Sequence, residues 1–211
     1  PTRRVFLKVG GVTIAGAALA AACTPAPKEE QLAQTGTTPT TAAKATYEPQ
    51  GDIATDITLL RVAQSIEKLA IAAYEAALAT DLLTPEVIEA AELFREHHNE
   101  HFEALATTLD DLGGDSFNEP NPALVETVLT PAAQSIEAGG ATFASLVELA
   151  IDLEDAAAQT YNNSTSLFTT ASLRQTAMSI GGVEARHVAV LLGVRSPGNR
   201  LIQVPFAFEK T

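Results

Sequence analysis

Ionisable side chains that can bind a metal occur in this sequence in two similar copies. Each copy has a glutamate, a tyrosine seven residues later, and then a segment in which a histidine stands three positions after another ionisable residue. Carboxylate oxygens and imidazole nitrogens are ligands for iron, manganese, zinc and copper. The repeat therefore predicts a metal site. The two copies are Glu67, Tyr74, His98, His101 and Glu154, Tyr161, Glu184, His187.

Four predicted helices carry these residues. Apolar residues recur at steps of three and four, which is the period of a helix with one buried face. Little of the alternating pattern that indicates strands occurs before residue 200. We therefore expect an all-α protein. The predicted helices cover residues 56–80, 84–112, 142–162 and 171–193.

The lengths of the loops predict how these helices are connected. Short loops join the first helix to the second and the third to the fourth, whereas residues 113–141 form a long connection. Short loops join antiparallel neighbours, and one long connection lets the second pair cross over the first. We expect a four-helix bundle over residues 56–194 with one long crossover between helices two and three. The apolar segment 195–211 is expected to form an extended tail that packs on the bundle.

The candidate ligands lie in the middle of the predicted apolar faces. Burying a carboxylate without a partner costs several kcal/mol, and a bound cation compensates for this directly. Glu184 and His187 lie one helical turn apart on one face, so both can reach the same ion. The candidate metal ligands are Glu67, His98, His101, Glu154, Glu184 and His187.

Further residues near these positions have two interpretations each. Tyr74 and Tyr161 are either core aromatics or groups that hydrogen-bond the ligands. His97 lies on the same helix flank as a candidate ligand four residues later. Gly181 and Gly182 lie inside the fourth predicted helix, where each costs about 1 kcal/mol relative to alanine. They indicate either close helix packing or room for a ligand or a local bulge.

Residues 56–193 resemble the ferritin-like superfamily, which includes bacterioferritin and rubrerythrin. That family has a glutamate on its first and third helices and Glu-x-x-His on its second and fourth. The resemblance implies a di-iron carboxylate bundle that reacts with oxygen or peroxide. The residues at matching positions are Glu67, His101, Glu154, Glu184 and His187.

His98 stands where that family has a glutamate that bridges two metal ions. The set then has three carboxylates and three imidazoles, so two divalent ions would keep one uncompensated positive charge. Imidazole also bridges metals less readily than carboxylate does. The alternatives to a di-iron site are therefore a mononuclear iron site, an asymmetric pair of metal ions, or a manganese, zinc or copper site.

Residues 1–23 resemble a bacterial export signal. A twin arginine followed by the apolar run 9–22 is similar to a twin-arginine (Tat) signal, and the small residues before Cys23 resemble a lipoprotein cleavage site. We expect lipidation at Cys23 and an exported, membrane-anchored lipoprotein in the periplasm or on the cell surface. A retained anchor helix is the alternative. Residues 24–55, rich in Thr, Pro and Ala, are expected to form a flexible tether.

Charge and cysteine content exclude several classes of protein. After residue 23 the chain has 26 acidic and 10 basic residues, a net charge of −16. This balance argues against nucleic-acid binding. Cys23 is the only cysteine, so neither a disulfide framework nor a thiolate metal site is expected in the bundle.

Two functions fit these observations. The first is an exported ferritin-like metal-binding protein, with an oxidoreductase that handles iron, oxygen or peroxide as the finer hypothesis. The second is a lipid-anchored structural or interaction module of the cell envelope with a degenerate metal site. In that case the buried acids pair with histidines, for example Glu184 with His98 and Glu67 with His101. A homodimer or an envelope protein partner stays open in both.

Overall fold

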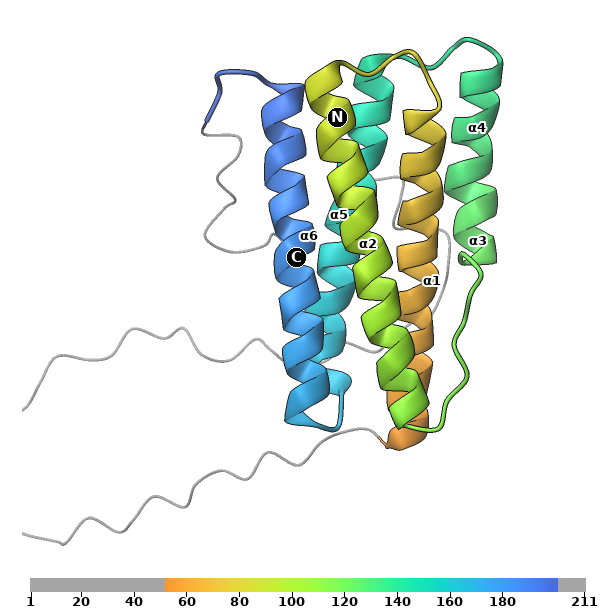
Figure 1. Cartoon of the computed structure of the whole chain (residues 1–211), viewed down its shortest axis with the longest axis vertical. Helices are drawn as coiled ribbons and strands as arrows, with labels where there is room; N and C mark the ends of the chain where they lie inside the picture. Colours follow the sequence, from red (N-terminus) through yellow and green to blue (C-terminus); the bar gives the residue numbers. More distant parts are fainter. Residues whose placement is uncertain (1–51, 201–211) are drawn as a thin grey trace, which may run out of the picture. The chain divides into compact units, whose positions relative to one another are not determined.

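The computed structural model describes residues 52–200 as a helical bundle (Figure 1). α1 packs against α2 and α5 against α6, each pair antiparallel. No strand occurs within the described residues. The predicted all-α bundle is therefore confirmed. Its four long helices are α1 (Ile53–Leu78), α2 (Pro85–Asp111), α5 (Phe143–Ser164) and α6 (Ala171–Arg195).

The connection between α2 and α5 is the predicted long crossover. It contains the single turn α3 (Pro122–Leu124), the π-helical segment η2 (Val125–Leu129) and α4 (Thr130–Glu137). In Figure 1, α4 runs beside α1 on the outside of the four long helices. The crossover returns the chain to the end of the bundle where α2 begins, so α2 and α5 run in the same direction. A short 3₁₀ turn, η3 (Thr165–Leu167), follows α5.

Capping side chains explain where two of the long helices begin. Asp52 accepts a hydrogen bond from the Thr55 N–H at 2.8 Å, which starts α1 three residues before the predicted start. Thr142 and Ser145 form a reciprocal capping box, in which each side chain accepts from the other residue's N–H. These side chains satisfy backbone donors that have no partner inside the helix.

Several predicted segments lie outside the described residues. These are the signal segment 1–23 with Cys23, most of the tether 24–55, and the tail from residue 201 onward. Where the predictions meet the described chain, the boundaries move slightly. Residues 53–55 belong to α1 rather than to the tether, and Arg195 ends α6 rather than starting the tail.

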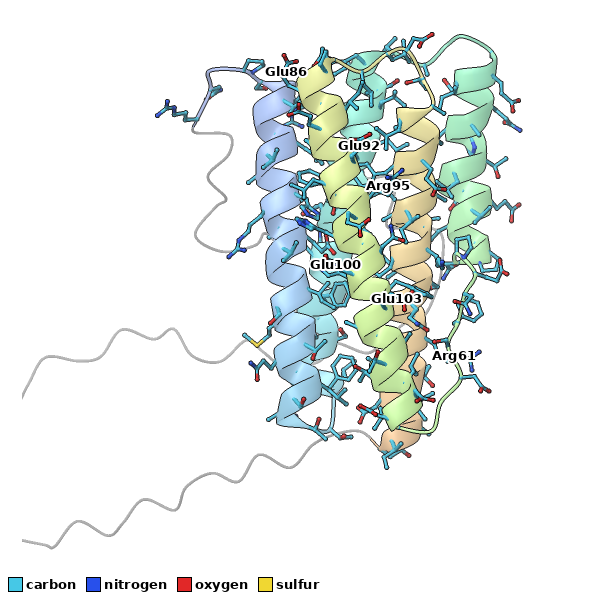
Figure 2. All side chains as sticks on the ribbon, viewed as in Figure 1. Arg61, Glu86, Glu92, Arg95, Glu100 and Glu103 are labelled. Atoms are coloured by element: carbon cyan, nitrogen blue, oxygen red, sulfur yellow. The ribbon has the colours of Figure 1, made fainter. Side chains whose placement is uncertain are left out.

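The core consists of two apolar clusters along the bundle. One includes Leu60, Leu105 and Leu109, and the other includes Phe94 and Leu191. Among the charged side chains labelled in Figure 2, Arg61 lies on α1, and the others follow the outer surface of α2. Between the two apolar clusters lies a layer of buried ionisable side chains, and this layer contains the candidate ligands.

Two further buried polar residues serve the loops. Asp56 accepts a hydrogen bond from the Thr169 N–H at 3.0 Å, which ties the start of α1 to the loop before α6. Gln64 Oε1 accepts from the Phe117 N–H at 2.7 Å, which ties the start of the crossover to α1. Both side chains are fully buried and satisfied by neighbouring backbone, so they need no cation.

Gly181 and Gly182 are expected to respond in opposite ways to alanine. A Cβ at Gly181 would lie 3.0 Å from the Tyr161 Cβ, whereas one at Gly182 would meet nothing within 4 Å. Alanine gains about 1 kcal/mol over glycine in a helix, and overpacking costs about 1–3 kcal/mol. Gly182→Ala should therefore raise the free energy of unfolding by up to about 1 kcal/mol, and Gly181→Ala should lower it by about 1 kcal/mol.

Urea denaturation of both variants measures these changes. Equal stabilisation by the two substitutions would contradict the close approach of α5 and α6 at Gly181. α6 is a continuous α-helix through both glycines, so the structure favours close packing over a local bulge.

Candidate metal centre

All six predicted ligands converge in the middle of the bundle, one or two from each long helix. They form two groups of four, and within each group the ligand atoms lie within 4.8 Å of one another. Two residues, His98 of α2 and Glu184 of α6, belong to both groups. The groups are Glu67, His98, His101, Glu184 and His98, Glu154, Glu184, His187.

The first half of the cluster is completed by Glu67 of α1 and His101 of α2. Glu67 Oε2 lies 2.7 Å from His98 Nδ1 and 3.6 Å from His101 Nδ1. His101 Nδ1 lies 2.9 Å from Glu184 Oε1. Glu67 is fully buried, whereas 13% of the His101 side chain is exposed, so this half is the more open to solvent at α2.

The second half is completed by Glu154 of α5 and His187 of α6. His98 Nε2 lies 3.2 Å from Glu154 Oε1. His187 Nδ1 lies 3.1 Å from Glu154 Oε2 and 3.0 Å from Glu184 Oε2. Each shared residue therefore directs one donor atom to each half: His98 through its two ring nitrogens and Glu184 through its two carboxylate oxygens.

The closest pairs are not those predicted for a degenerate site. The prediction paired Glu184 with His98 and Glu67 with His101, and these atoms lie 3.7 and 3.6 Å apart. The shorter contacts join Glu67 to His98 and Glu184 to His101, at 2.7 and 2.9 Å. The acids and imidazoles thus face one another across helices, in a different arrangement from the predicted one.

Contacts within the cluster favour protonated imidazoles. Burial alone would lower the pKa of His98, but its bonds to Glu154 and Glu67 raise that pKa well above its ordinary value. In the same way burial is outweighed at His101, where Glu184 and Glu67 raise the pKa to about 9. Glu154 and Glu184 raise the pKa of His187 against its burial.

The two terminal carboxyl groups shift in the opposite direction. Burial would raise the pKa of Glu67, but its contacts with His101 and His98 lower it. The pKa of Glu154 is likewise lowered, because His187 and His98 outweigh its burial. Without a metal, Glu67 and Glu154 are therefore charged, and the imidazoles hold protons that a cation would displace.

Three buried atoms are near charged partners without the geometry of a hydrogen bond. They are His101 Nδ1 and both carboxylate oxygens of Glu184. A buried polar atom without a hydrogen bond costs about 1–3 kcal/mol. A metal ion needs lone pairs directed at a common point rather than donor–acceptor alignment. The donor set and these three atoms therefore fit a bound transition-metal ion.

The two tyrosines hydrogen-bond the terminal carboxylates crosswise. Tyr161 of α5 donates to Glu67 Oε1 of α1, and Tyr74 of α1 donates to Glu154 Oε1 of α5. Burial, reinforced by the adjacent carboxylate, raises the pKa of both phenols well above the ordinary value, so they stay donors. Both interpretations of the tyrosines hold: the rings pack in the core and the hydroxyls hold the candidate ligands.

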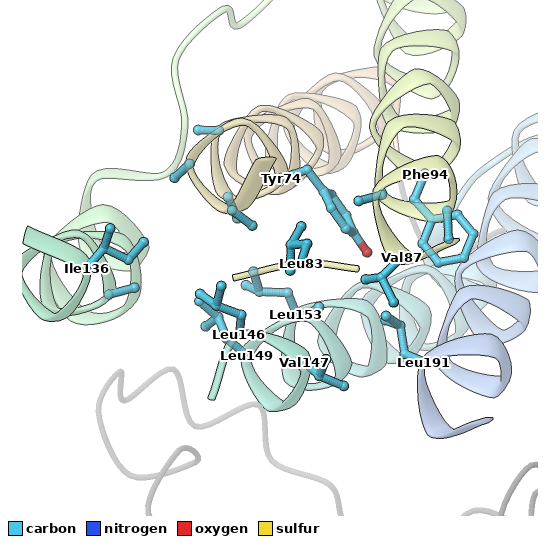
Figure 3. Close-up of a pocket in the computed structure, with 18 of the residues that line it drawn as sticks. Tyr74, Leu83, Val87, Phe94, Ile136, Leu146, Val147, Leu149, Leu153 and Leu191 are labelled. Carbon is cyan, nitrogen blue, oxygen red and sulfur yellow. The ribbon is translucent and has the colours of Figure 1, made fainter. Parts of the chain in front are cut away.

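An apolar cavity of about 230 Å³ lies next to the second half. In Figure 3, Tyr74 and Phe94 stand on one side of it and Ile136 of α4 on the other. Both of those rings also contact cluster histidines: Tyr74 stacks on His98 and Phe94 on His187. The cavity is thus separated from the candidate ligands by a single layer of aromatic rings.

His97 also reaches the cluster, although it was not among the predicted ligands. Its Nδ1 lies 2.9 Å from His187 Nε2, a partner on α6 rather than on its own helix. The sequence signal was that His97 lies four residues before His101, on the same flank of its helix. That signal did not reveal its partner, because the contact spans 90 residues of chain.

A comparison with known protein families agrees with the helical bundle and its donor set. The family model described as a ferritin-like domain matches residues 55–196, which include all four long helices except the first residues of α1. No curated protein and no solved structure matches the chain. Because the family match covers more than half of the chain and contains all six candidate ligands, the chain belongs to the ferritin-like domain family.

Proposed function

We propose that this protein binds transition-metal ions in the cluster and acts as an oxidoreductase that handles iron, oxygen or peroxide. One observation carries the proposal: His98 and Glu184 each present one donor atom to each half of a buried six-residue donor set. Iron fits the family and the mixture of oxygen and nitrogen donors best, and manganese, zinc or copper are the alternatives.

Each residue of the cluster has a separate task in this proposal. Glu67 and His101 would hold an ion in the first half, and Glu154 and His187 would hold one in the second. Tyr161 and Tyr74 fix the orientation of the two terminal carboxylates. Bound iron would supply electron exchange with oxygen or peroxide. The apolar clusters on both sides of the layer limit its contact with water.

His98 leaves the site short of one negative charge when both halves are filled. Three carboxylates leave one positive charge uncompensated on two divalent ions, because His98 replaces the family's glutamate. The first ion should therefore bind more tightly than the second. The same excess charge favours two metal ions bound with different affinities over two ions bound equally tightly.

The cavity beside Phe94 supports the choice of a small uncharged oxidant. It is lined almost entirely by alanine and larger aliphatic side chains, so it favours apolar molecules over water. Oxygen is small and apolar, and an oxygen molecule in the cavity would be separated from the cluster only by the aromatic rings between them.

Metal analysis of the purified full chain tests the proposal. Protein folded with iron or zinc should retain one to two ions per chain, whereas a His101→Ala, His187→Ala double variant should retain less than one. Glu100→Gln is the matched control, because Glu100 is exposed on α2 near the cluster. Absence of stoichiometric metal in the wild-type protein would refute the proposal.

Removal of the metal should lower thermal stability. A ligand present at about 100 times its dissociation constant stabilises the folded state by about 2.7 kcal/mol. A chelator is therefore expected to lower the melting temperature of metal-loaded protein by several degrees. Calorimetry with and without chelator measures the shift. An unchanged melting temperature would favour the second function, a structural or interaction module whose acids and histidines neutralise one another.

The location of the protein is a separate part of the proposal. The twin arginine and the small residues before Cys23 support export and lipid anchoring of the bundle through the tether. Metabolic labelling with a radioactive fatty acid should mark the wild-type protein and leave a Cys23→Ser variant unlabelled. Equal labelling of the two proteins would contradict lipidation at Cys23.

A further inference from the structure

We propose that His97 positions His187 for metal binding by accepting a hydrogen bond from it. The inference rests on the proposed metal-binding function and concerns a residue outside the six-residue donor set. His187 has two ring nitrogens, and they face in different directions. Nδ1 faces the carboxylates of Glu154 and Glu184 at 3.1 and 3.0 Å, whereas Nε2 lies 2.9 Å from His97 Nδ1.

The partners of each nitrogen determine which one donates a hydrogen bond. Two carboxylates surround Nδ1, so Nδ1 is the atom that would give up its proton to a cation. Nε2, which lies 2.9 Å from His97 Nδ1, would then keep its proton and donate it to that nitrogen. A ligand histidine whose other nitrogen donates to a fixed acceptor keeps both its tautomer and its ring orientation. His97 is therefore the acceptor that leaves His187 Nδ1 free for the metal.

Ring packing holds this hydrogen bond in place. The His97 and His187 rings are nearly parallel, 10° apart, with centroids separated by 5.2 Å. Phe94, one helical turn before His97 on α2, stacks on His187 with its centroid 4.0 Å away. α2 therefore contributes both an aromatic surface and a hydrogen-bond acceptor to a ligand carried by α6. A stacking role alone would need no acceptor nitrogen.

Three variants separate the acceptor from the stacking role. His97→Phe keeps an aromatic ring beside His187 and removes the acceptor. His97→Gln removes the ring and keeps an acceptor, the amide oxygen. Glu96→Gln is the matched control, because Glu96 is the exposed neighbour of His97 and has no part in the contact.

Zinc affinity of the full chain, measured against a competing chelator, is the first readout. Loss of a group that orients a ligand weakens metal binding by about 10–100-fold. We expect that loss for His97→Phe, near wild-type affinity for His97→Gln, and no change for Glu96→Gln. Wild-type affinity in folded His97→Phe, or equal weakening in His97→Phe and His97→Gln, would overturn the inference.

The second readout uses metal-free protein and so does not depend on metal binding. The His187 Nε2–H should give a proton signal protected from exchange with water in the wild type and in His97→Gln, and this signal should be lost in His97→Phe. If the wild type binds no zinc, the proposed function fails, while this signal still shows whether His97 holds His187. Absence of a protected signal in the wild type would overturn the inference.

Discussion

Replacing Glu184 by glutamine should weaken the binding of both metal ions by more than about 100-fold. This exceeds the loss expected for a group that only orients a ligand. Glu184 turns Oε1 toward His101 and Oε2 toward His187, so each half of the cluster uses one of its oxygens. An amide is neutral and a poor ligand, and the change removes one of only three negative charges. Both halves therefore lose a donor and a charge at once.

Metal stoichiometry and affinity in the purified full chain measure this effect. Glu103→Gln is the matched control, because it removes a charge from the exposed surface of α2 without touching the cluster. Glu67→Gln is informative as well, since Glu67 serves the first half alone. This substitution should weaken binding of the ion in the first half and leave binding in the second half unchanged. Retention of two tightly bound ions in Glu184→Gln would show that the shared role assigned to Glu184 is wrong.

The second large effect is on the pH dependence of stability in metal-free protein. The pKa values of His98, His101 and His187 are raised, so their stabilising effect is complete below about pH 6.5 and is lost as the pH rises through the folded-state values. For His101 the folded value is about 9. We expect the free energy of unfolding to fall by about 3 kcal/mol between pH 6.5 and 9 from His101 alone.

The acids limit stability at the other end of the range. The pKa values of Glu67 and Glu154 are lowered, so their contribution is present above about pH 4.5 and is lost as the pH falls below it. Metal-free protein should therefore be most stable between about pH 4.5 and 6.5. In metal-loaded protein the free energy of unfolding should instead rise as the pH increases above 6.5, because protons compete with the metal for the imidazoles.

Urea denaturation at pH 6, 7.5 and 9, with chelator and with zinc, measures both trends. His101→Gln is the control variant, since it removes one titrating imidazole and should flatten the chelator curve. If stability with chelator rose from pH 6.5 to 9, the protonated state assigned to the histidines would be wrong. If zinc left the slope unchanged, the metal would not be displacing imidazole protons.

Local patterns in the sequence were sufficient for the helices and for the position of the cluster along them. The helical period and the loop lengths can be recognised from residues that are close in the sequence. A buried ionisable group can be recognised in the same way, as a charged residue within the apolar face of a helix. The helical period does not by itself fix which face of α2 is buried. Phe102 and Leu109 are buried there, whereas Leu112 is only partly buried. Steps of three and four allow more than one phase along 27 residues.

Contacts between helices were decided only by the tertiary structure. The sequence by itself determined that three acids and three histidines share a buried layer in a ferritin-like bundle. It did not determine that Glu67 pairs with His98, that Tyr161 holds Glu67, or that His97 meets His187. These contacts join residues 31 to 94 positions apart. They depend on the axial register and rotation of four helices, which the packing of the whole core sets and no local spacing encodes.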